Sequence, residues 1–422
     1  MGSVAVGLRA AATRFGTPVF VTDVAAIDDA ARAMRAAYPD PWQRNFSLKA
    51  NDVTGIVRLL GDRGFGANVV SSGEWAIARR AGLPNGRITL EGVGKTDRDL
   101  RAAVVAARTG EPLRWVAIES PDEAFALQRL AGRLPVGHGL DVLMRLNPDV
   151  SAETLPDLAV GAGVSKFGMT ETELSETVAQ LAAGIPLRPR GIHLHVGSQL
   201  GAVDAWRDGI RRALALLALL RGGLRDFDTL DLGGGFPVLP PGDPAPDPAR
   251  FAREIPDLLD AVPADRRPAH LAIEPGRALV ARAGWLVARV LHVRERAGRQ
   301  VILDAGMTEL IRPALYGARH DIVALTSLRQ AIQSDGDPRD APTYDATPTA
   351  VEGPICESSD HLGEHLLPIL QRGDLVAIGD AGAYGASMGS TYNGRPRPPQ
   401  VLFQSDGRLD LIRSRASIGS LG

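Results

Sequence analysis

Lysine, cysteine and net charge are all scarce in this sequence of 422 residues. It has three lysines against 44 arginines (47 basic residues less three), one cysteine, and a formal net charge of −2. Because the positive and negative charges nearly balance, the sequence shows no excess of positive charge that would bind nucleic acid or an anionic membrane surface. We therefore expect neither as a partner. A single cysteine excludes an internal disulfide and is typical of a reducing cytoplasm.

Long hydrophobic runs are also missing. The longest strongly apolar run, 213–220, is far below the roughly 18 residues that a membrane span needs, and arginines flank it. Residues 1–12 contain no extended apolar core, so we do not expect a signal peptide. Apolar residues make up 45% of the chain and charged residues 23%, an ordinary globular balance. We therefore expect a cytoplasmic protein, whose length suits two domains.

The scarcity of lysine draws attention to the lysines that remain. Arginine can replace lysine wherever only positive charge is needed, but its guanidinium cannot lose a proton and attack a carbonyl. Lys49 lies in the stretch Asn-Phe-Ser-Leu-Lys-Ala-Asn-Asp (45–52), a short β-like run that ends in a small-polar turn. Drift towards arginine-rich codons would leave three lysines by chance, and it is the alternative for any one of them. The setting of Lys49 favours a functional amine.

Short β-rich runs alternate with longer helical stretches between about residue 45 and residue 275. Eight strands with intervening helices over this length predict a (β/α)8 barrel, and a doubly wound sheet is the structural alternative. The predicted strands are Asn45–Lys49, Gly66–Val70, Arg87–Glu91, Arg114–Glu119, Asp141–Asn147, Gly191–Val196, Thr229–Leu232 and His270–Glu274. Helical spacing is clear over Gly73–Ala81, Asp97–Arg108, Pro121–Leu130, Glu171–Ala183 and Asp204–Arg221.

The pattern changes after Gly284, where strand-like runs, most of them rich in valine, follow one another with little helical periodicity. We predict a barrel domain over 24–283 and an all-β domain over 284–422, which a strand at Pro18–Thr22 within residues 1–23 would join. The strand-like runs are Trp285–Arg294, Gln300–Asp304, Thr349–Glu352 and Asp374–Ile378. Loops are predicted over 240–248 and 334–348.

Candidate functional side chains gather at the carboxyl ends of the predicted barrel strands, where (β/α)8 barrels place their active sites. Lys49 ends the first strand, His195 lies at the end of the sixth, Gly233–Gly235 follow the seventh, and the segment 274–277 ends the eighth. Each signal alone has a plain structural explanation: a turn, a structural histidine, or a surface ion pair worth at most about 1 kcal/mol. Their joint placement favours an enzyme that holds pyridoxal 5′-phosphate through a lysine amine.

In such a site each residue type has a specific task. Backbone N–H groups of the glycines can approach a phosphate closely. Arg277 can add a charge-assisted bond to the same phosphate or to a substrate carboxylate. The carboxylate of Glu274 can keep the pyridine nitrogen protonated, and the flat ring of His195 can stack on the cofactor.

The predicted β domain carries two further candidates. Cys356 lies in Gly-Pro-Ile-Cys-Glu-Ser-Ser-Asp (353–360), which is typical of a polar turn rather than a core strand. A free cysteine is usually a small buried hydrophobe, but in this turn it can donate or accept a proton. Tyr384 is flanked by glycines in 382–388, as in a loop that reaches a ligand, and an ordinary turn tyrosine is the alternative. No metal site is predicted.

These segments, with several others in the same order, resemble the fold-type III pyridoxal-phosphate decarboxylases. The resemblance runs from about residue 15 to residue 402 and is strongest to the diaminopimelate decarboxylase branch. Ile-Arg-Pro-Ala-Leu-Tyr-Gly (311–317) is similar to that branch rather than to eukaryotic ornithine decarboxylases. The resemblance implies an alanine-racemase-like, TIM-like barrel followed by a β domain. The other matching segments are Phe15–Pro18, Val70–Glu74, Arg145–Asp149, Ser165–Gly168, His193–Gln199 and Asp304–Met307.

The resemblance also implies a role for each matching residue. Lys49 would hold the cofactor, His195 would stack on its ring, and Cys356 would protonate the carbon that loses CO2. Phosphate and pyridine nitrogen would be held by Ser198, Gly234, Gly235, Glu274, Gly276 and Arg277. The substrate would meet Arg277, Arg312, Tyr316, Glu357 and Tyr384, of which Tyr384 would also contact the cofactor.

A homodimer with active sites shared across the interface is implied as well. In this family the Cys-Glu segment at 356–357 reaches the active site of the other subunit. Lys166 matches a family position and would form an ion pair across or near the interface, and Lys95 lies in a loop after the third strand that also resembles the family.

The expected reaction is decarboxylation of meso-2,6-diaminopimelate to L-lysine and CO2, in lysine biosynthesis. Three departures leave the substrate open: Asn68 where the family usually has aspartate, the region of Leu155 (153–161), which lacks the usual histidine, and Gln400 in place of a glutamate. A paralogous decarboxylase of ornithine, lysine or a carrier-bound or conjugated amino acid in an antibiotic, siderophore or polyamine pathway is therefore the alternative.

Two more distant alternatives are a racemase of the same barrel class and a catalytically inactive homologue that works by protein binding. The Cys-Glu-Ser-Ser-Asp segment disfavours the racemase, because it resembles a decarboxylase feature. Retention of Lys49 and Cys356 disfavours the inactive homologue.

Overall fold

The computed structural model describes residues 3–132, 134–135, 138–150, 165–182, 186–238, 246–296, 298–334, 337–340 and 345–420. The predicted departure around Leu155 lies outside the described residues, as do parts of both predicted loops. Internal contacts divide the chain into two compact units. The barrel unit comprises Ala31–Leu239 and Asp243–Ala278, and the β unit comprises Met1–Ala30, Pro240–Gly242 and Leu279–Gly422.

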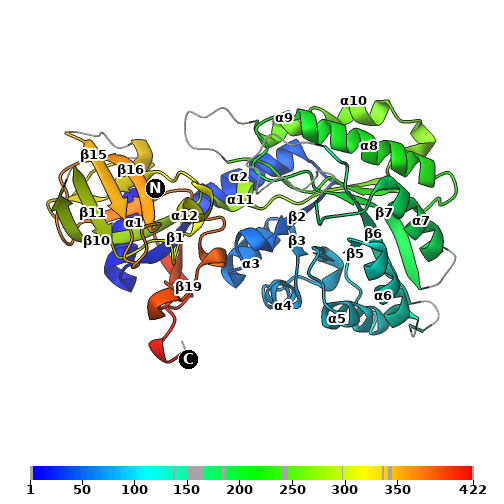
Figure 1. Cartoon of the computed structure of the whole chain (residues 1–422), viewed down its shortest axis with the longest axis horizontal. Coiled ribbons are helices and arrows are strands. Elements are labelled where there is room, and N and C mark those ends of the chain that lie inside the picture. Colours follow the sequence, from blue (N-terminus) through cyan, green and yellow to red (C-terminus); the bar gives the residue numbers. More distant parts are fainter. Residues whose placement is uncertain are drawn as a thin grey trace. The chain divides into compact units, whose positions relative to one another are not determined.

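Within the described residues, eight parallel strands close into a barrel, which confirms the predicted fold class (Figure 1). The first and last strands complete the ring, with Gln43 opposite Ala272 and Arg44 opposite Ile273. The strands are β2 (Gln43–Ser47), β3 (Gly66–Val69), β4 (Ile88–Leu90), β5 (Trp115–Ile118), β6 (Leu140–Leu146), β7 (Leu187–Leu194), β8 (Thr229–Asp231) and β9 (His270–Ile273). Most of them end one or two residues before the predicted limit, so several candidate side chains lie just beyond a strand.

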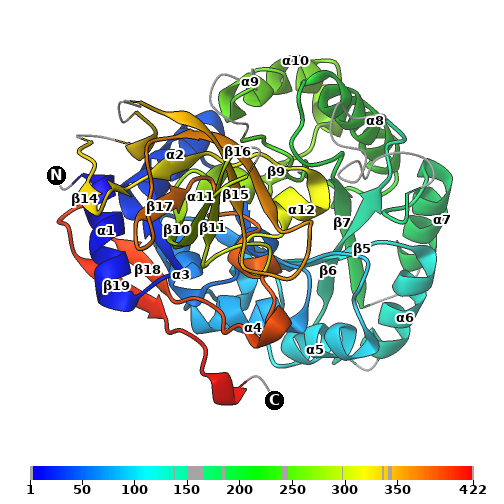
Figure 2. The ribbon, with the colours of Figure 1, turned by 60° about the vertical axis from the view of Figure 1, so that its left-hand side comes forward.

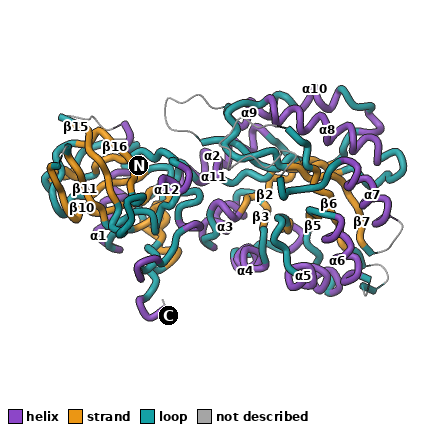
Figure 3. Tube along the Cα trace, viewed as in Figure 1, coloured by secondary structure: helices purple, strands orange, loops and turns teal. Residues whose placement is uncertain are grey.

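Helices lie outside the barrel strands (Figure 3), and all of them except α2 (Val24–Ala37), which precedes β2, follow a barrel strand along the chain. The helices after β3, β4 and β5 begin with a side-chain cap: Ser71, Thr96 and Ser120 each accept a hydrogen bond from the backbone N–H three residues later. These caps fix the short loops that leave β3, β4 and β5. The helices are α2 (Val24–Ala37), α3 (Thr54–Asp62), α4 (Ser72–Arg80), α5 (Asp97–Arg108), α6 (Pro121–Ala131), α7 (Glu171–Ala182), α8 (Asp204–Leu220), α9 (Pro248–Ala252), α10 (Ile255–Asp260) and α11 (Arg277–Val280).

The β unit is built on a mixed sheet. Figure 2 shows β10, β11, β15 and β16 side by side, and the full order is β16-β15-β11-β10-β1-β18-β19, with β17 pairing β10 and β12. The strands are β1 (Val19–Asp23), β10 (Gly284–Glu295), β11 (Arg299–Leu303), β12 (Ile322–Ala324), β15 (Thr347–Glu352), β16 (His361–Leu367), β17 (Leu375–Ile378), β18 (Gln400–Phe403) and β19 (Leu409–Arg413), with a hairpin of β13 (Thr326–Ser327) and β14 (Gln330–Ala331).

The central strands of this sheet contribute side chains to two hydrophobic cores. Val19 and Val21 of β1 belong to one core and Phe20 to the other, as the twofold side-chain period of a strand requires. Helix α1 (Val4–Phe15) contributes Leu8 to the first core. The unit is a sheet domain, as predicted, and it also contains α1 and the short α12 (Arg312–Tyr316). None of the described helices is long and apolar enough to span a membrane.

Candidate active site

Four predicted site segments lie at the carboxyl ends of barrel strands. His195 follows β7, Gly233–Gly235 lie beyond β8, and Glu274 follows β9. Lys49, which was predicted to end its strand, instead lies in a 3-10 turn (Leu48–Ala50) directly after β2. In this turn the two neighbours of Lys49 are buried and the lysine itself is exposed. Because the strands are parallel and closed, all these segments share one rim of the barrel.

The turn that carries Lys49 packs against the segment after β9. Ser47 donates its backbone N–H to the carbonyl of Pro275 at 3.1 Å. A Cβ on Gly276 would come within 3.1 Å of the Ala50 Cβ and 3.3 Å of the Ser47 Cβ. Glycine at 276 therefore permits the close approach of the lysine turn and the Glu274 segment.

The glycine run after β8 is fixed by its neighbours. Gly233 and Gly235 have φ of 67° and 107°, the left-handed region that glycine tolerates. A Cβ on Gly234 would lie 2.5 Å from the carbonyl oxygen of Glu274. The N–H of Gly233 donates to Asp231 Oδ1 at 2.9 Å and that of Gly234 to His195 Nδ1 at 3.1 Å, so only the N–H of Gly235 has no hydrogen-bond partner among the described residues.

The same hydrogen bond fixes the tautomer of His195. Because Nδ1 accepts from Gly234, the hydrogen of the neutral ring is on Nε2. Burial and the nearby positive charge of Lys49 lower the pKa of His195 well below its usual value, so the ring is uncharged at neutral pH. A neutral, oriented imidazole can stack on a flat cofactor.

Arg277 and Ser198 form a second group at this rim. Arg277 opens α11 and is buried, with 7% of its surface exposed, and its Nη2 donates to Ser198 Oγ at 3.4 Å. A guanidinium beside a hydroxyl provides charge-assisted donors suited to a phosphate or a carboxylate.

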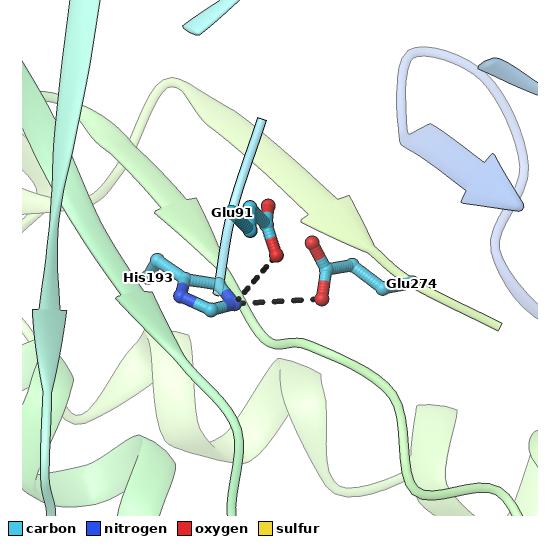
Figure 4. A group of neighbouring side chains, drawn as sticks. All are labelled: Glu91, His193 and Glu274. Carbon is cyan, nitrogen blue, oxygen red and sulfur yellow. Dashed lines mark hydrogen bonds and ion pairs between the residues drawn. The ribbon is translucent and has the colours of Figure 1, made fainter. Parts of the chain in front are cut away.

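Behind the rim, Glu274 belongs to a buried polar cluster that the sequence did not predict (Figure 4). His193 Nε2 lies 3.4 Å from Glu274 Oε2 and 3.3 Å from Glu91 Oε2. Asn68 donates its Nδ2 hydrogen to the same Glu91 oxygen at 2.9 Å. The other oxygen of Glu274, Oε1, has no hydrogen-bond donor among the described residues.

The other two lysines, Lys95 and Lys166, contact side chains of their own neighbourhood. Lys95 has only 1% of its side chain exposed; its Nζ lies 2.9 Å from Glu123 and donates to the carbonyl of Gly92. Lys166 lies over the ring of Phe167, with its Nζ 5.3 Å from the ring centre. The predicted intersubunit ion pair of Lys166 stays a prediction.

The predicted residues of the β unit lie within ordered turns. Cys356 is exposed, and its neighbour Glu357 accepts a hydrogen bond from the hydroxyl of Tyr392 at 2.7 Å. The carboxylate of Asp360 holds this turn, accepting from the backbone N–H of Ile355 at 2.7 Å and of Met307 at 2.6 Å.

Arg312, Tyr316 and Tyr384 lie elsewhere in the β unit. Arg312 opens α12 and donates to Nε2 of His320 at 3.0 Å, while His320 Nδ1 donates to the carbonyl of Gly379 at 2.9 Å. Tyr316 ends the same helix and is half-buried. Tyr384 has a φ of 58°, which is unusual for a bulky residue and is typical of functional sites.

Comparison with known proteins decides the family. The family model "pyridoxal-dependent decarboxylase, pyridoxal binding domain" matches residues 24–281, which span the whole barrel. The chain belongs to the pyridoxal-dependent decarboxylases. This confirms the resemblance inferred from the motifs.

Relatives of this decarboxylase match over almost its full length. The diaminopimelate decarboxylase of Aquifex aeolicus is 35% identical over 414 residues, covering 97% of this chain and 92% of that protein. The Helicobacter pylori diaminopimelate decarboxylase crystallised with L-lysine is 30% identical, with a TM-score of 0.87 over 98% of each chain. The M. jannaschii diaminopimelate decarboxylase in co-complex with L-lysine is 29% identical, with a TM-score of 0.86 over 98% of this chain and 93% of that one.

Sequence reasoning missed two polar residues inside the barrel of this decarboxylase. His193 is the first histidine of the same His-x-His whose second member, His195, was singled out, and its even spacing was a usable signal. Glu91 follows β4, and a lone carboxylate after an apolar strand gave no indication of its partners. Their meeting depends on barrel closure, which joins β4, β7 and β9 across the interior.

Proposed function

We propose that this decarboxylase converts meso-2,6-diaminopimelate to L-lysine and CO2 with pyridoxal 5′-phosphate as its cofactor. The observation that carries the proposal is the packing of the Lys49 turn against the Glu274 segment. This packing places a lysine amine and a buried carboxylate at one barrel rim. The full-length relatives are diaminopimelate decarboxylases, which supports the choice of substrate.

The barrel residues fit this cofactor. Glu274 Oε1, buried and without a donor among the described residues, can accept a hydrogen bond from a protonated pyridine nitrogen. Ser198, Arg277 and the N–H of Gly235, which has no partner among the described residues, offer donors for a phosphate, and Lys49 offers the amine. When bound, the cofactor supplies an electron sink for the pair left behind as the carboxylate departs.

Each barrel residue then has a defined task. Lys49 would hold the cofactor through its amine. The neutral ring of His195, oriented by Gly234, would contact the cofactor ring and add no positive charge there. Gly276 keeps Glu274 close to the lysine turn. Glu274 holds the proton of the pyridine nitrogen, which keeps the electron sink strong while the Cα–carboxylate bond breaks.

The β-unit residues are proposed to serve the substrate. Arg312 and the hydroxyl of Tyr316 would hold the distal carboxylate together with Arg277 of the barrel unit, and Glu357 would meet the distal amine. Tyr384, held in a left-handed conformation, would contact cofactor and substrate. The Cys356 thiol would deliver a proton to the carbon that has lost CO2. A proton from solvent would then convert the thiolate back to the thiol.

We further propose a cytoplasmic homodimer in which the Cys356 segment of one subunit serves the site of the other. Sedimentation would measure its mass. Mixing Lys49→Ala with Cys356→Ala protein tests the sharing directly: heterodimers regain one intact site if the sites are shared, and mixtures stay inactive if they are not.

The decisive experiment is CO2 release by the purified holoenzyme from a panel of amino acids. We expect release from meso-2,6-diaminopimelate with L-lysine as the product. Release from ornithine, lysine or a conjugated amino acid instead would replace the substrate and leave the chemistry intact. No release from any of them, with bound cofactor present, would refute the proposed activity.

A further inference from the structure

The interior of the barrel contains two buried carboxyl groups, those of Glu91 and Asp231, besides Glu274, the one proposed to bind the cofactor. Glu91, His193 and Glu274 are 3%, 1% and 5% exposed, and their ligand atoms all lie within 4.8 Å of one another (Figure 4). Asp231, the last residue of β8, is fully buried beside them, and its Oδ1 accepts from the N–H of Gly233. Three carboxyl groups and one imidazole therefore meet where water cannot screen them.

The positively charged side chains that act on this cluster also interact with other groups. Arg145, whose charge acts on Glu91, forms a buried ion pair with Glu119 at 2.7 Å. The charge of Lys49 acts on His193 and His195 from the rim. Three ionised carboxylates would leave uncompensated charge in a dry interior, which costs several kcal/mol per ion.

A count of hydrogens leads to the same conclusion. His193 Nε2 faces one oxygen of Glu91 at 3.3 Å and one of Glu274 at 3.4 Å. A neutral ring has at most one hydrogen on that nitrogen, so two ionised glutamates would have to share it. A proton on Glu91 removes the conflict, because the single hydrogen on Nε2 can then be donated to Glu274 and the neutral acid needs no share of it.

The surrounding charges favour that proton. Burial, and then the negative charge of Glu274, raises the pKa of Glu91 to about 8, against the opposing effects of His193 and Arg145. Burial and the charges of Glu274 and Glu91 likewise raise the pKa of Asp231 well above its usual value. Burial lowers the pKa of His193 to about 4, so its ring is neutral.

We propose that Glu91 is a positioning residue that keeps a proton beside His193 and Glu274, so that these three residues together carry one negative charge, on Glu274. This inference rests on the proposed function, in which Glu274 holds the proton of the pyridine nitrogen. With Glu91 neutral, Glu274 faces the cofactor as a single charge. When Glu91 loses its proton, the second charge strengthens the hold of Glu274 on the pyridinium proton.

The test is infrared titration of protonated carboxyl groups, with and without cofactor, alongside the visible absorption of the holoenzyme. In the wild type we expect one buried carboxyl signal to disappear with a midpoint near pH 8. The visible band of the bound cofactor should shift over the same range. In Glu91→Gln, which mimics the protonated acid, both transitions should be lost.

Two further variants keep the test sharp. Glu309→Gln removes a buried glutamate of the β unit (2% exposed) and should leave both transitions in place. Should Glu91→Gln fold poorly, Asn68→Asp/Glu91→Gln exchanges amide and carboxyl across the 2.9 Å hydrogen bond and should restore a titrating acid. Transitions that persist in Glu91→Gln would overturn the proposal.

Failure of the inference and failure of the proposed function are distinguishable. The infrared signal needs neither cofactor nor substrate, so it can be measured in a protein that binds no pyridoxal phosphate. A divalent ion is the competing occupant, because His193 and the two glutamates are suitable ligand types. Stoichiometric zinc or manganese that survives dialysis, detected by metal analysis, would overturn the proposed proton on Glu91.

Discussion

The backbone N–H of Gly234 donates to Nδ1 of His195 at 3.1 Å, so the glycine run after β8 and the imidazole after β7 act as one element. The sequence suggested that this glycine would bind a phosphate. Within the described residues its N–H binds the His195 ring, and we propose that Gly235, Ser198 and Arg277 supply donors to the anion.

Gly234→Ala should weaken cofactor binding. The new Cβ would lie 2.5 Å from the carbonyl oxygen of Glu274, so the two segments must move apart. This shift would disturb the hydrogen bond from the Gly234 N–H to His195. We expect a loss of about tenfold to a hundredfold in affinity for pyridoxal phosphate, equivalent to about 1–3 kcal/mol. Titration of the cofactor absorbance measures it. Gly86→Ala, where a Cβ meets nothing within 4 Å, is the matched control and should bind normally.

Borohydride reduction of the holoenzyme should attach the cofactor to Lys49 alone. Lys49 is exposed in its turn at the barrel rim, whereas Lys95 is buried against Glu123. Peptide mass mapping identifies the labelled lysine among only three. Lys49→Ala should lose the label and the yellow colour, and Lys166→Ala should keep both. A label on Lys95 or Lys166 would refute the role given to Lys49.

Glu91 should make the stability of the fold depend on pH. Its pKa rises from 4.5 to about 8 on folding, so between these values the folded protein keeps a proton that the unfolded chain has released. The free energy of unfolding then falls as pH rises, by up to about 1.4 kcal/mol per pH unit, and levels off above pH 8.

Denaturant unfolding at several pH values checks this slope. Glu91→Gln should gain stability relative to the wild type as the pH rises from 5 to 8. Glu111→Gln, at a site where 66% of the glutamate side chain is exposed, should track the wild type. Parallel curves for the wild type and Glu91→Gln would mean that the acid carries no raised pKa.

Tyr392→Phe should affect substrate binding more than turnover. The Tyr392 hydroxyl donates to Glu357 Oε1 at 2.7 Å and orients the carboxylate that we assign to the distal amine. Loss of this partly exposed bond should raise KM for diaminopimelate about threefold to tenfold, with kcat nearly unchanged. Steady-state kinetics would separate the two. A drop in kcat with KM constant would argue that Tyr392 acts on the chemical step.

Several elements could be predicted from the sequence because their signals are local. Alternating β and helical runs predicted the barrel, and the glycine run, His195 and Glu274 were correctly placed near strand ends. Helix α1 was not predicted although Leu8 and Ala12 have helical spacing, because the rest of its buried face is alanine and glycine, which give a weak apolar pattern. Lys49 was placed in a strand because the turn Leu48–Ala50 has no glycine or proline to mark it.

The buried cluster was beyond such reasoning. Asn68 was noted only as a departure from its family, without the reason that the structure gives: its amide donates to Glu91. Residues 68, 91, 193 and 274 lie on four different barrel strands or the loops that follow them. Only closure of the barrel brings them together, and no spacing along the chain encodes it.

The position of β1 has a consequence for how the chain folds as it is synthesised. Val21 pairs with Trp285 on one side and with Val401 on the other, so this early strand lies between two strands made hundreds of residues later. Contacts this distant close slowly. The barrel strands, each paired mainly with the next, can assemble while the ribosome is still working. The first strand of the β unit to leave the ribosome must therefore wait with both edges unpaired until β10 arrives, and with one edge unpaired until β18, nearly the last strand, follows.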